Sequence, residues 1–478
     1  MTGHRRQVGP PDRNGHILVQ IMVLGGLAAV FVSSMMSWAV LNYRAGRSAV
    51  ERERAIQLAE AGLDYYRWHL AHAPTDFQDG TGQPGPYQHD LTDRDGNVVG
   101  HFVLEITPPD TGSSEVTVRS SGDTGATFSP ERHLTATLTK PSFARYAVAA
   151  DDFMRFGEGT EVHGPIHSNK GIRFDGLAYN VVSSSVDSYD DPDHSGGNEF
   201  GVHTHLFPTD PLPPSAPPSR SDVFMVGRQF PVASVDFDGM TADFAVMKSD
   251  AEDGGFYRPS AGAQGYHIVF RTDDTFDLYK ATKLLNAPDG CWNSNNQDGW
   301  GTWSIENEHL IGNFPLPDNG LIFLEDDVFV DGQIDGARVT VVAAFLPDNP
   351  PFRKNIIVNR DLLYTAHDGT DSIGLIAQGH VMTGLVSWDD LRIDAALIAQ
   401  KGKVGRFYYP EGCSPYHQRH SITLWGMIAT AVRYGFAYTD GTGYAFRYIN
   451  YDGSLFLNPP PSFPLTADQY VVTSWAER

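Results

Sequence analysis

Residues 16–73 constrain the fold more than any other stretch, because they contain no proline and change character halfway. Residues 17–41 form an uncharged, mostly apolar run of about 25 residues, which is long enough to cross a bilayer core of roughly 30 Å. Beyond residue 42, apolar residues recur at helical spacing. The sequence therefore predicts one helix over residues 16–73, on the order of 85 Å long. Its first half would lie in lipid, and its second half would pack on a folded domain through one stripe: Ala49, Ile56, Ala59, Leu63, Tyr66 and Leu70.

The residues before this helix indicate what kind of membrane segment it is. Residues 1–15 contain His4, Arg5, Arg6 and Arg13 and end at Gly15. A secretory signal peptide has an apolar region of about 7–15 residues followed by a cleavage site. The present run is longer and continues into a helix. By the positive-inside rule, residues 1–15 stay cytoplasmic and everything beyond residue 41 lies outside. We predict a single-pass inner-membrane protein with an extracytoplasmic C-terminal domain. Lipid would surround the first half of its N-terminal helix.

Composition excludes one class of partner and favours a β protein. Asp and Glu number 58 against 35 Lys and Arg, a formal net charge of −23. Nucleic acid is therefore not an expected partner, since binding it requires clustered cations. The 48 glycines, 31 prolines and 12% aromatic residues are typical of a turn-rich β protein. The two cysteines, Cys291 and Cys413, are compatible with one disulfide in an oxidising compartment, although the sequence does not show that they meet.

Short β-branched runs fill the rest of the chain. Between residues 74 and 140 they alternate with turn residues, which predicts a small antiparallel head sheet on the helix. Between residues 320 and 406, strand centres at Val341, Ile357, Ile376 and Ile398 are roughly 16 to 22 residues apart, as in the coils of a β-solenoid. The last three should face one core. A β-sandwich is the alternative.

The predicted fold class is thus mainly β, with a long N-terminal transmembrane and amphipathic helix, a small antiparallel head and a large β-solenoid resembling a parallel β-helix. The boundaries are a leader at residues 1–15, the helix at 16–73, the head at 74–140 and the solenoid at 141–478. A Pro-rich loop at 208–218 and a short helix at 238–250 interrupt the solenoid near residues 206–320.

Residues that could carry chemistry are few. His203 and His205 would share one face of a strand and could bind a metal, but we find no nearby Cys or Glu to complete a ligand set. Adjacent aspartates would point to opposite faces of a strand. No phosphate loop, nucleophile elbow or zinc-peptidase motif is present. We therefore predict no catalytic residue, no metal site and no cofactor. The other pairs considered are His163 with His167, Asp326 with Asp327, and Asp389 with Asp390.

Several of these segments resemble a known family. The basic leader ending in glycine, the apolar helix and the run RAIQLAEAGL at residues 54–63 resemble type IV prepilins, and in particular PilX-type minor pilins and the large pseudopilins of type II secretion. GPIHSN at 164–169, GLIA at 374–377 and PPPSFP at 459–464 resemble segments of PilX-like pilus assembly proteins with a solenoid. The resemblance implies cleavage by prepilin peptidase between Gly15 and His16. It also implies a filament helix contact at Gln20, where the family has a carboxylate.

The resemblance implies a non-enzymatic minor pilin-like component of a type IV pilus or type II secretion pseudopilus. Its place would be tip-proximal or initiating, and it would display the solenoid for assembly or adhesion at the cell surface. Its partners would be other pilins or pseudopilins, bound through the N-terminal helix. Two alternatives remain open. One is a signal-anchored carbohydrate-active β-helix enzyme; the other is a membrane-anchored surface binding protein unrelated to a filament.

Overall fold

The computed structural model describes residues 14–109, 114–126, 131–237, 240–466 and 469–477. They form two compact units. The first contains one long helix and a small sheet, and we call it the helix unit. The second contains a large parallel-strand sheet between residues 138 and 473, and we call it the ladder unit. The fold is mainly β, as the sequence predicts.

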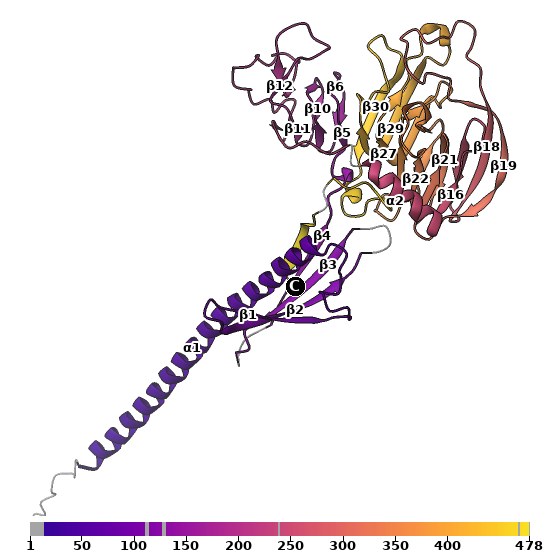
Figure 1. The fold of residues 1–478 in the computed structure, drawn as a ribbon. Helices are drawn as coiled ribbons and strands as arrows, with labels where there is room; N and C mark the ends of the chain where they lie inside the picture. Colours follow the sequence, from indigo (N-terminus) through magenta and orange to yellow (C-terminus); the bar gives the residue numbers. More distant parts are fainter. Residues whose placement is uncertain (1–13, 110–113, 127–130, 238–239, 467–468, 478) are drawn as a thin grey trace, which may run out of the picture. The chain divides into compact units, whose positions relative to one another are not determined.

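Helix α1 (Asn14–His72) is one unbroken helix of 59 residues, in close agreement with the predicted 16–73 (Figure 1). Its first half lies exposed, and by length and composition it is a candidate membrane span. An 18-residue window reaches a mean hydropathy of 2.2, and none of that window is buried. The serines in this half donate their hydroxyls to carbonyls four residues earlier, for example Ser33 to Ala29 at 2.7 Å. The helix therefore satisfies these polar groups internally, as a hydrocarbon environment requires.

The second half of α1 packs on the small sheet, but along a line shifted from the predicted stripe. Tyr66 and Leu70 are buried as expected, as is Ala59. Ala49 is exposed, and Ile56 and Leu63 are only half-buried. The residues that join the buried line instead are Ala55, Leu58 and Gly62.

The shift follows from how closely the helix approaches the sheet. A Cβ at Gly122 would lie 2.1 Å from the carbonyl oxygen of Ala55, and a Cβ at Gly62 would lie 2.2 Å from Ser120 Oγ. Such proximity admits only small residues at the contact. The line nearest the sheet is therefore marked by alanine and glycine, which a search for large apolar residues overlooks.

The small sheet has five strands in the order β1-β2-β3-β4-β31, and β1–β2 and β2–β3 pair antiparallel. The last of these strands comes from the C-terminal end of the chain. The solenoid range predicted to reach residue 478 thus includes a strand of the small sheet, and the ladder unit is inserted between two neighbouring strands of that sheet. The strands are β1 (Tyr87–Thr92), β2 (Val98–Thr107), β3 (Val116–Asp123), β4 (Arg132–Thr139) and β31 (Val471–Glu477).

The ladder unit is built on parallel ladders, which confirms the pairing predicted for residues 320–406. One ladder runs through six strands in sequence order, each parallel to the next. These strands are β16 (Phe256–Arg258), β20 (Leu321–Leu324), β22 (Arg338–Ala343), β25 (Ser372–Ala377), β27 (Asp390–Ala399) and β29 (Gln418–Thr430).

The stacking order then departs from the sequence order, because β29 pairs in parallel with β5 from the beginning of the unit. Ile428 lies opposite Val148 in this pairing. From β5 (Val148–Ala150) the ladder continues through three more strands. These are β8 (Ile166–Ser168), β11 (Val182–Ser184) and β15 (Arg228–Gln229).

Further strands stack beside this ladder, also in parallel. They are β17 (Tyr266–Phe270), β21 (Val328–Ile334), β23 (Ile356–Ile357), β24 (Leu362–Tyr364), β26 (Val381–Thr383), β28 (Val404–Arg406), β30 (Gly443–Tyr451), β7 (Glu161–Val162) and β10 (Leu177–Ala178). Short strands near the first coils are β6 (Met154–Phe156), β9 (Ile172–Phe174), β12 (Ser188–Tyr189), β13 (Glu199–Phe200) and β14 (Val202–His203).

One helix and one pair of strands interrupt the parallel pattern where the sequence predicts an insertion. Helix α2 (Met240–Asp253) corresponds to the short helix expected at 238–250. Strands β18 (Thr275–Leu284) and β19 (Ile305–Pro315) form an antiparallel extension of β17. Phe244 and Met247 of α2 pack against one face of the main ladder.

One prediction about the core is wrong. Ile376 and Ile398 are buried, but they lie in the cluster beneath α2, and Ile357 belongs to a third cluster. The residues that face the interior between the ladders are their neighbours Leu375 and Leu397. Both faces of these strands are buried, so a continuous apolar run does not show which residues point inward.

Candidate functional site

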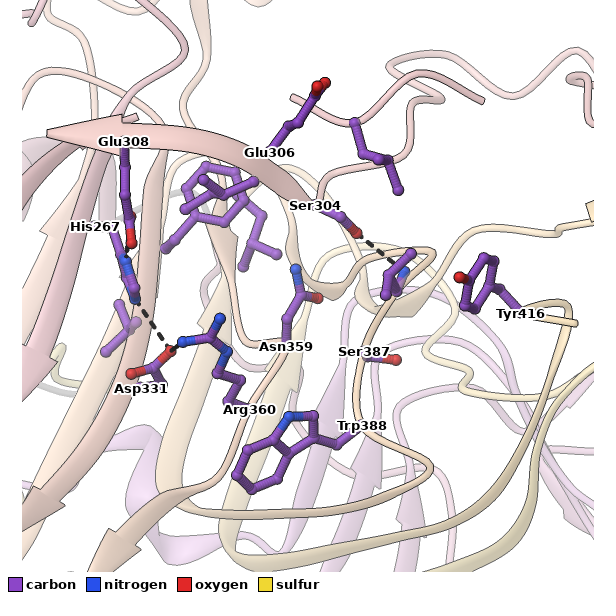
Figure 2. Close-up of a pocket in the computed structure, with 16 residues that line it drawn as sticks. His267, Ser304, Glu306, Glu308, Asp331, Asn359, Arg360, Ser387, Trp388 and Tyr416 are labelled. Carbon is purple, nitrogen blue, oxygen red and sulfur yellow. Dashed lines mark hydrogen bonds and ion pairs between the residues drawn. The ribbon is translucent and has the colours of Figure 1, made fainter. Parts of the chain in front are cut away.

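A groove of about 510 Å³ in the ladder unit combines charged and aromatic side chains from separate strands (Figure 2). His267 of β17 lies between Glu308 of β19 and Asp331 of β21. Its Nδ1 lies 2.7 Å from Glu308 Oε2, and its Nε2 lies 3.0 Å from Asp331 Oδ2. Arg360 lies 3.9 Å from the same Asp331 carboxylate, and the indole of Trp388 is half exposed at the groove.

The electrostatics of this group keep His267 in its protonated, cationic form, so it is not available as a free base. Burial lowers the pKa of His267, but the hydrogen bonds and charges of Asp331 and Glu308 outweigh it and raise this pKa to about 9. The imidazolium therefore donates from both nitrogens at neutral pH. A general base needs an unprotonated nitrogen, and general acid work needs a proton directed at substrate. The arrangement instead presents fixed charges beside an aromatic face, which suits binding.

The aspartate pairs singled out in the sequence are occupied by neighbours. Asp326 accepts hydrogen bonds from the Ser260 hydroxyl and the Ala261 N–H, at 2.9 and 2.8 Å. Asp327 accepts the N–H of Asn355 at 2.8 Å, and burial raises its pKa to about 6. These contacts tie adjacent coils together. At the second pair, Asp389 accepts the backbone N–H of His420 and Asp390 contacts the ring of the same histidine.

The histidine pairs have two different outcomes. His163 is exposed and stacks on Tyr179, with ring centroids 4.0 Å apart. His167 is buried and hydrogen-bonded to Ser183 at 3.0 Å, so this pair does not form a common site. His203 and His205 do come together, with ring centroids 5.1 Å apart.

His203 and His205 are joined by three residues that sequence reasoning missed: Asp191, His194 and Glu199. The atoms of Asp191, His203 and His205 that could ligate a metal ion lie within 4.8 Å of one another. The corresponding atoms of His194, Glu199 and His205 also lie within 4.8 Å of one another. The sequence analysis found no Glu to complete a ligand set, yet Glu199 is only four residues before His203. The spacing D-x-x-H at 191–194 and E-x-x-x-H-x-H at 199–205 is the signal that could have found the cluster.

The remaining site residues of the sequence analysis lie elsewhere. Cys291 and Cys413 are joined in a disulfide, beside a buried cluster that includes Phe407. Gln20 lies on the exposed half of α1. Gly15 and His16 lie in the first turn of α1, where the structure describes the backbone alone.

Comparisons with known proteins add little to this description. No protein-family model matches the chain, and no curated protein matches it. Among solved structures, the competence-associated pilin ComZ from Thermus thermophilus matches with 12% sequence identity, over 90% of this chain and 98% of that chain, at a TM-score of 0.27. An identity and a TM-score this low assign neither a family nor a function to the chain.

Proposed function

We propose that this protein is a non-enzymatic minor pilin-like subunit, anchored by α1 and displaying the ladder unit as an extracellular β-solenoid. The observation that carries the proposal is the division of one continuous helix into two halves. The first half is apolar and exposed, and the second is packed on a small sheet. A helix of this kind can reside in the inner membrane as a monomer. It can then leave lipid for a bundle of similar helices, because residues 17–41 carry no charge.

The leader supports a prepilin route to the surface. On this proposal, prepilin peptidase removes residues 1–15 and leaves His16 as the new N-terminus. The mature helix then contacts other pilins or pseudopilins. The domain boundaries follow the same scheme: a leader, an anchoring helix, a head and a displayed solenoid.

Two features support a tip-proximal or initiating position. A buried carboxylate in a helix bundle requires a cationic partner. The amide of Gln20 avoids that requirement, which suits a subunit with no neighbour ahead of it. In addition, the parallel strands of the ladder unit all come from the chain between β4, which ends at Thr139, and β31, which begins at Val471. Such bulk would clash if repeated at the close axial spacing of a filament shaft.

The groove around His267 supports display for binding more than for hydrolysis. Glycosidases need one carboxylic acid that can donate a proton and a second free carboxylate. Here Glu308 and Asp331 are both held by the same imidazolium. An adhesive or assembly contact makes use of such fixed charges, with Trp388 as an aromatic platform.

N-terminal sequencing of the full-length chain tests the proposal. Chain recovered from membranes and from sheared surface filaments should begin at His16, and in filaments it should be far scarcer than the shaft subunit. Gly15→Ala should retain the leader, because the peptidase requires a residue with almost no side chain there. Gly26→Ala is a matched control, since no atom lies within 4 Å of the Cβ it would add.

A mature chain that begins at Met1 or beyond residue 41 would contradict the prepilin assignment. Recovery at the same abundance as the shaft subunit would contradict the tip position alone.

A further inference from the structure

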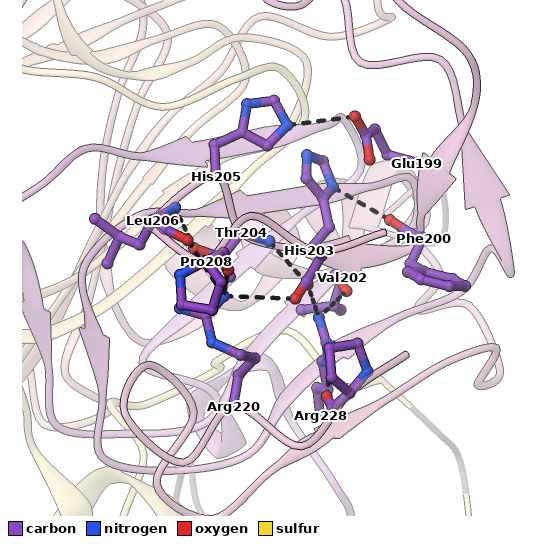
Figure 3. A network of polar contacts seen from close by, with 12 residues as sticks. Glu199, Phe200, Val202, His203, Thr204, His205, Leu206, Pro208, Arg220 and Arg228 are labelled. Atoms are coloured by element: carbon purple, nitrogen blue, oxygen red, sulfur yellow. Dashed lines mark hydrogen bonds and ion pairs between the residues drawn. The ribbon is translucent and has the colours of Figure 1, made fainter. Parts of the chain in front are cut away.

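In the cluster around His203 and His205, the ring of His203 is oriented so that one of its nitrogens could coordinate a metal ion (Figure 3). His203 is fully buried. Its Nδ1 lies 3.3 Å from the carbonyl oxygen of Phe200, so the ring donates its proton there. The unprotonated Nε2 then faces the cluster. Among the residues that the structure describes, none supplies a hydrogen bond to this atom. A backbone carbonyl that orients the far nitrogen of a histidine is the usual support of a metal-binding imidazole.

Asp191 is arranged in the same way. Its Oδ1 accepts the backbone N–H of Asp193 at 2.9 Å. Its Oδ2 is buried, has no hydrogen-bond donor in the described part of the chain, and lies 3.5 Å from His203 Nε2. One oxygen is therefore used to fix the carboxylate, and the other is left directed at the histidine.

His205 is the third member of the set with Asp191 and His203, and Glu199 contacts His205. Glu199 is buried, and its Oε1 lies 3.3 Å from His205 Nε2 (Figure 3). The same oxygen lies 3.3 Å from Nδ1 of His194, which is exposed at the edge of the cluster. The backbone N–H of His205 donates to Asp175 at 2.8 Å, which holds the segment after β14 in place.

The spacing of these ligand atoms can be compared with the spacing of ligands around a metal ion. Four ligands placed tetrahedrally at 2.0–2.1 Å from Zn²⁺ lie about 3.4 Å from one another. The 3.5 Å between Asp191 Oδ2 and His203 Nε2 is close to this value, and the ligand atoms of Asp191, His203 and His205 all lie within 4.8 Å of one another. Mixed imidazole and carboxylate donors suit Zn²⁺, whereas Ca²⁺ and Mg²⁺ prefer oxygen ligands alone.

We propose that Asp191, His203 and His205 bind one Zn²⁺ ion and leave its fourth position to solvent. Glu199, which contacts both His205 and His194, would support the ring of His205 from outside the ligand set. The ion would hold the segments that carry these residues together. Residues 190–198, between β12 and β13, are rich in Asp, Gly and Ser and have little apolar content to hold them. Asp191, near the start of this loop, would be fixed to His203 of β14 and to His205 just after it, and β14 pairs in parallel with β9.

Metal titration of the full-length chain in detergent tests the proposal. After treatment with EDTA, the chain should bind one equivalent of Zn²⁺ by calorimetry, and Co²⁺ should give the absorption bands of a tetrahedral site. Zn²⁺ should raise the melting temperature and slow proteolysis within residues 190–198.

Variants assign the binding to these residues. His205→Gln and Glu199→Gln keep side chains that can hydrogen-bond, and each should lower Zn²⁺ affinity tenfold or more. His309→Gln is the matched control, because His309 is exposed on β19 and should leave affinity unchanged. The proposal is overturned if the wild-type chain takes up no Zn²⁺, if it binds Ca²⁺ in preference, or if His205→Gln binds as tightly as the control.

Discussion

The helix unit and the ladder unit bury their apolar residues in different ways. In the helix unit, one face of α1 meets one face of a small sheet, and the contact depends on small residues such as Gly62 and Gly122. In the ladder unit, the strands are buried on both faces. One face lies in the interior between the ladders, and the other lies beneath α2 or in the cluster around the Cys291–Cys413 disulfide. The first unit therefore depends on close approach at a few positions, and the second on many stacked repeats.

The two units are therefore sensitive to substitution at different kinds of position. A parallel coil contributes to the coils on either side of it, so a charge placed in one coil affects its neighbours. A helix on a sheet is sensitive mainly where the two backbones are nearest.

Ile376→Asp should be the most damaging change. Ile376 is fully buried in β25, in register with Val342 and Ile398 of the adjacent strands. A carboxylate there would have no partner, and the cost should be several kcal/mol, on the order of 5, which is comparable to the whole stability of a domain. Circular dichroism and limited proteolysis of the full-length chain should show loss of the ladder unit.

Ile376→Val is the control, because it removes one methylene and should cost about 1 kcal/mol. If Ile376→Asp melts with the wild-type profile, a charge in one coil does not destabilise the neighbouring coils, which would contradict the expected dependence of each coil on the next.

The same contrast explains how much of the fold could be predicted from sequence. The extent of α1 and the parallel pairing of residues 320–406 follow from local patterns. The inward residues did not, because Leu375 and Ile376 are both fully buried and the apolar pattern does not distinguish them. The pairing of β29 with β5 and of β4 with β31 joins distant segments, and no local signal marks such contacts.

The candidate sites show a similar division. His203 and His205 were visible as a pair because only Thr204 separates them. The groove was not visible, because His267, Glu308 and Asp331 come from three strands and meet only through the stacking. Residues that are brought together by register across coils leave no spacing in the sequence.

The second prediction uses pH to probe one such contact in the ladder unit. The folded-state pKa of His267 is raised to about 9 from the ordinary 6.5. The stabilisation that protonated His267 contributes to the folded state is therefore fully present below about pH 6.5 and is lost as the pH rises through 9. Its size should be on the order of 3 kcal/mol. Melting temperatures between pH 6 and 10 should fall more steeply for the wild-type chain than for His267→Gln.

The difference between the two proteins is the informative quantity. Burial lowers the pKa of Lys403 to about 8, so this residue titrates in the same range, but it does so in both proteins and cancels. Parallel melting curves across this pH range would mean that the imidazolium does not bridge Glu308 and Asp331 in solution.

The smallest effect is expected from Gly122→Ala, which tests the close approach in the helix unit. The added Cβ would lie 2.1 Å from the carbonyl oxygen of Ala55 and 2.6 Å from the amide nitrogen of Ala59. Both are backbone atoms, so α1 must move away from β3, at a cost of about 2 kcal/mol. Amide exchange should quicken along the second half of α1, while exchange in β22, β25 and β27 should not change.

Gly46→Ala is the matched control, because it also adds one methyl group but meets no atom within 4 Å. As a glycine-to-alanine change in an exposed helix, it should stabilise α1 by up to about 1 kcal/mol. Opposite signs for these two substitutions would confine the sensitivity of the helix unit to the point of backbone contact. If both variants exchange like the wild-type chain, the tight contact between α1 and β3 is not maintained in solution, and the two units differ less than their packing implies.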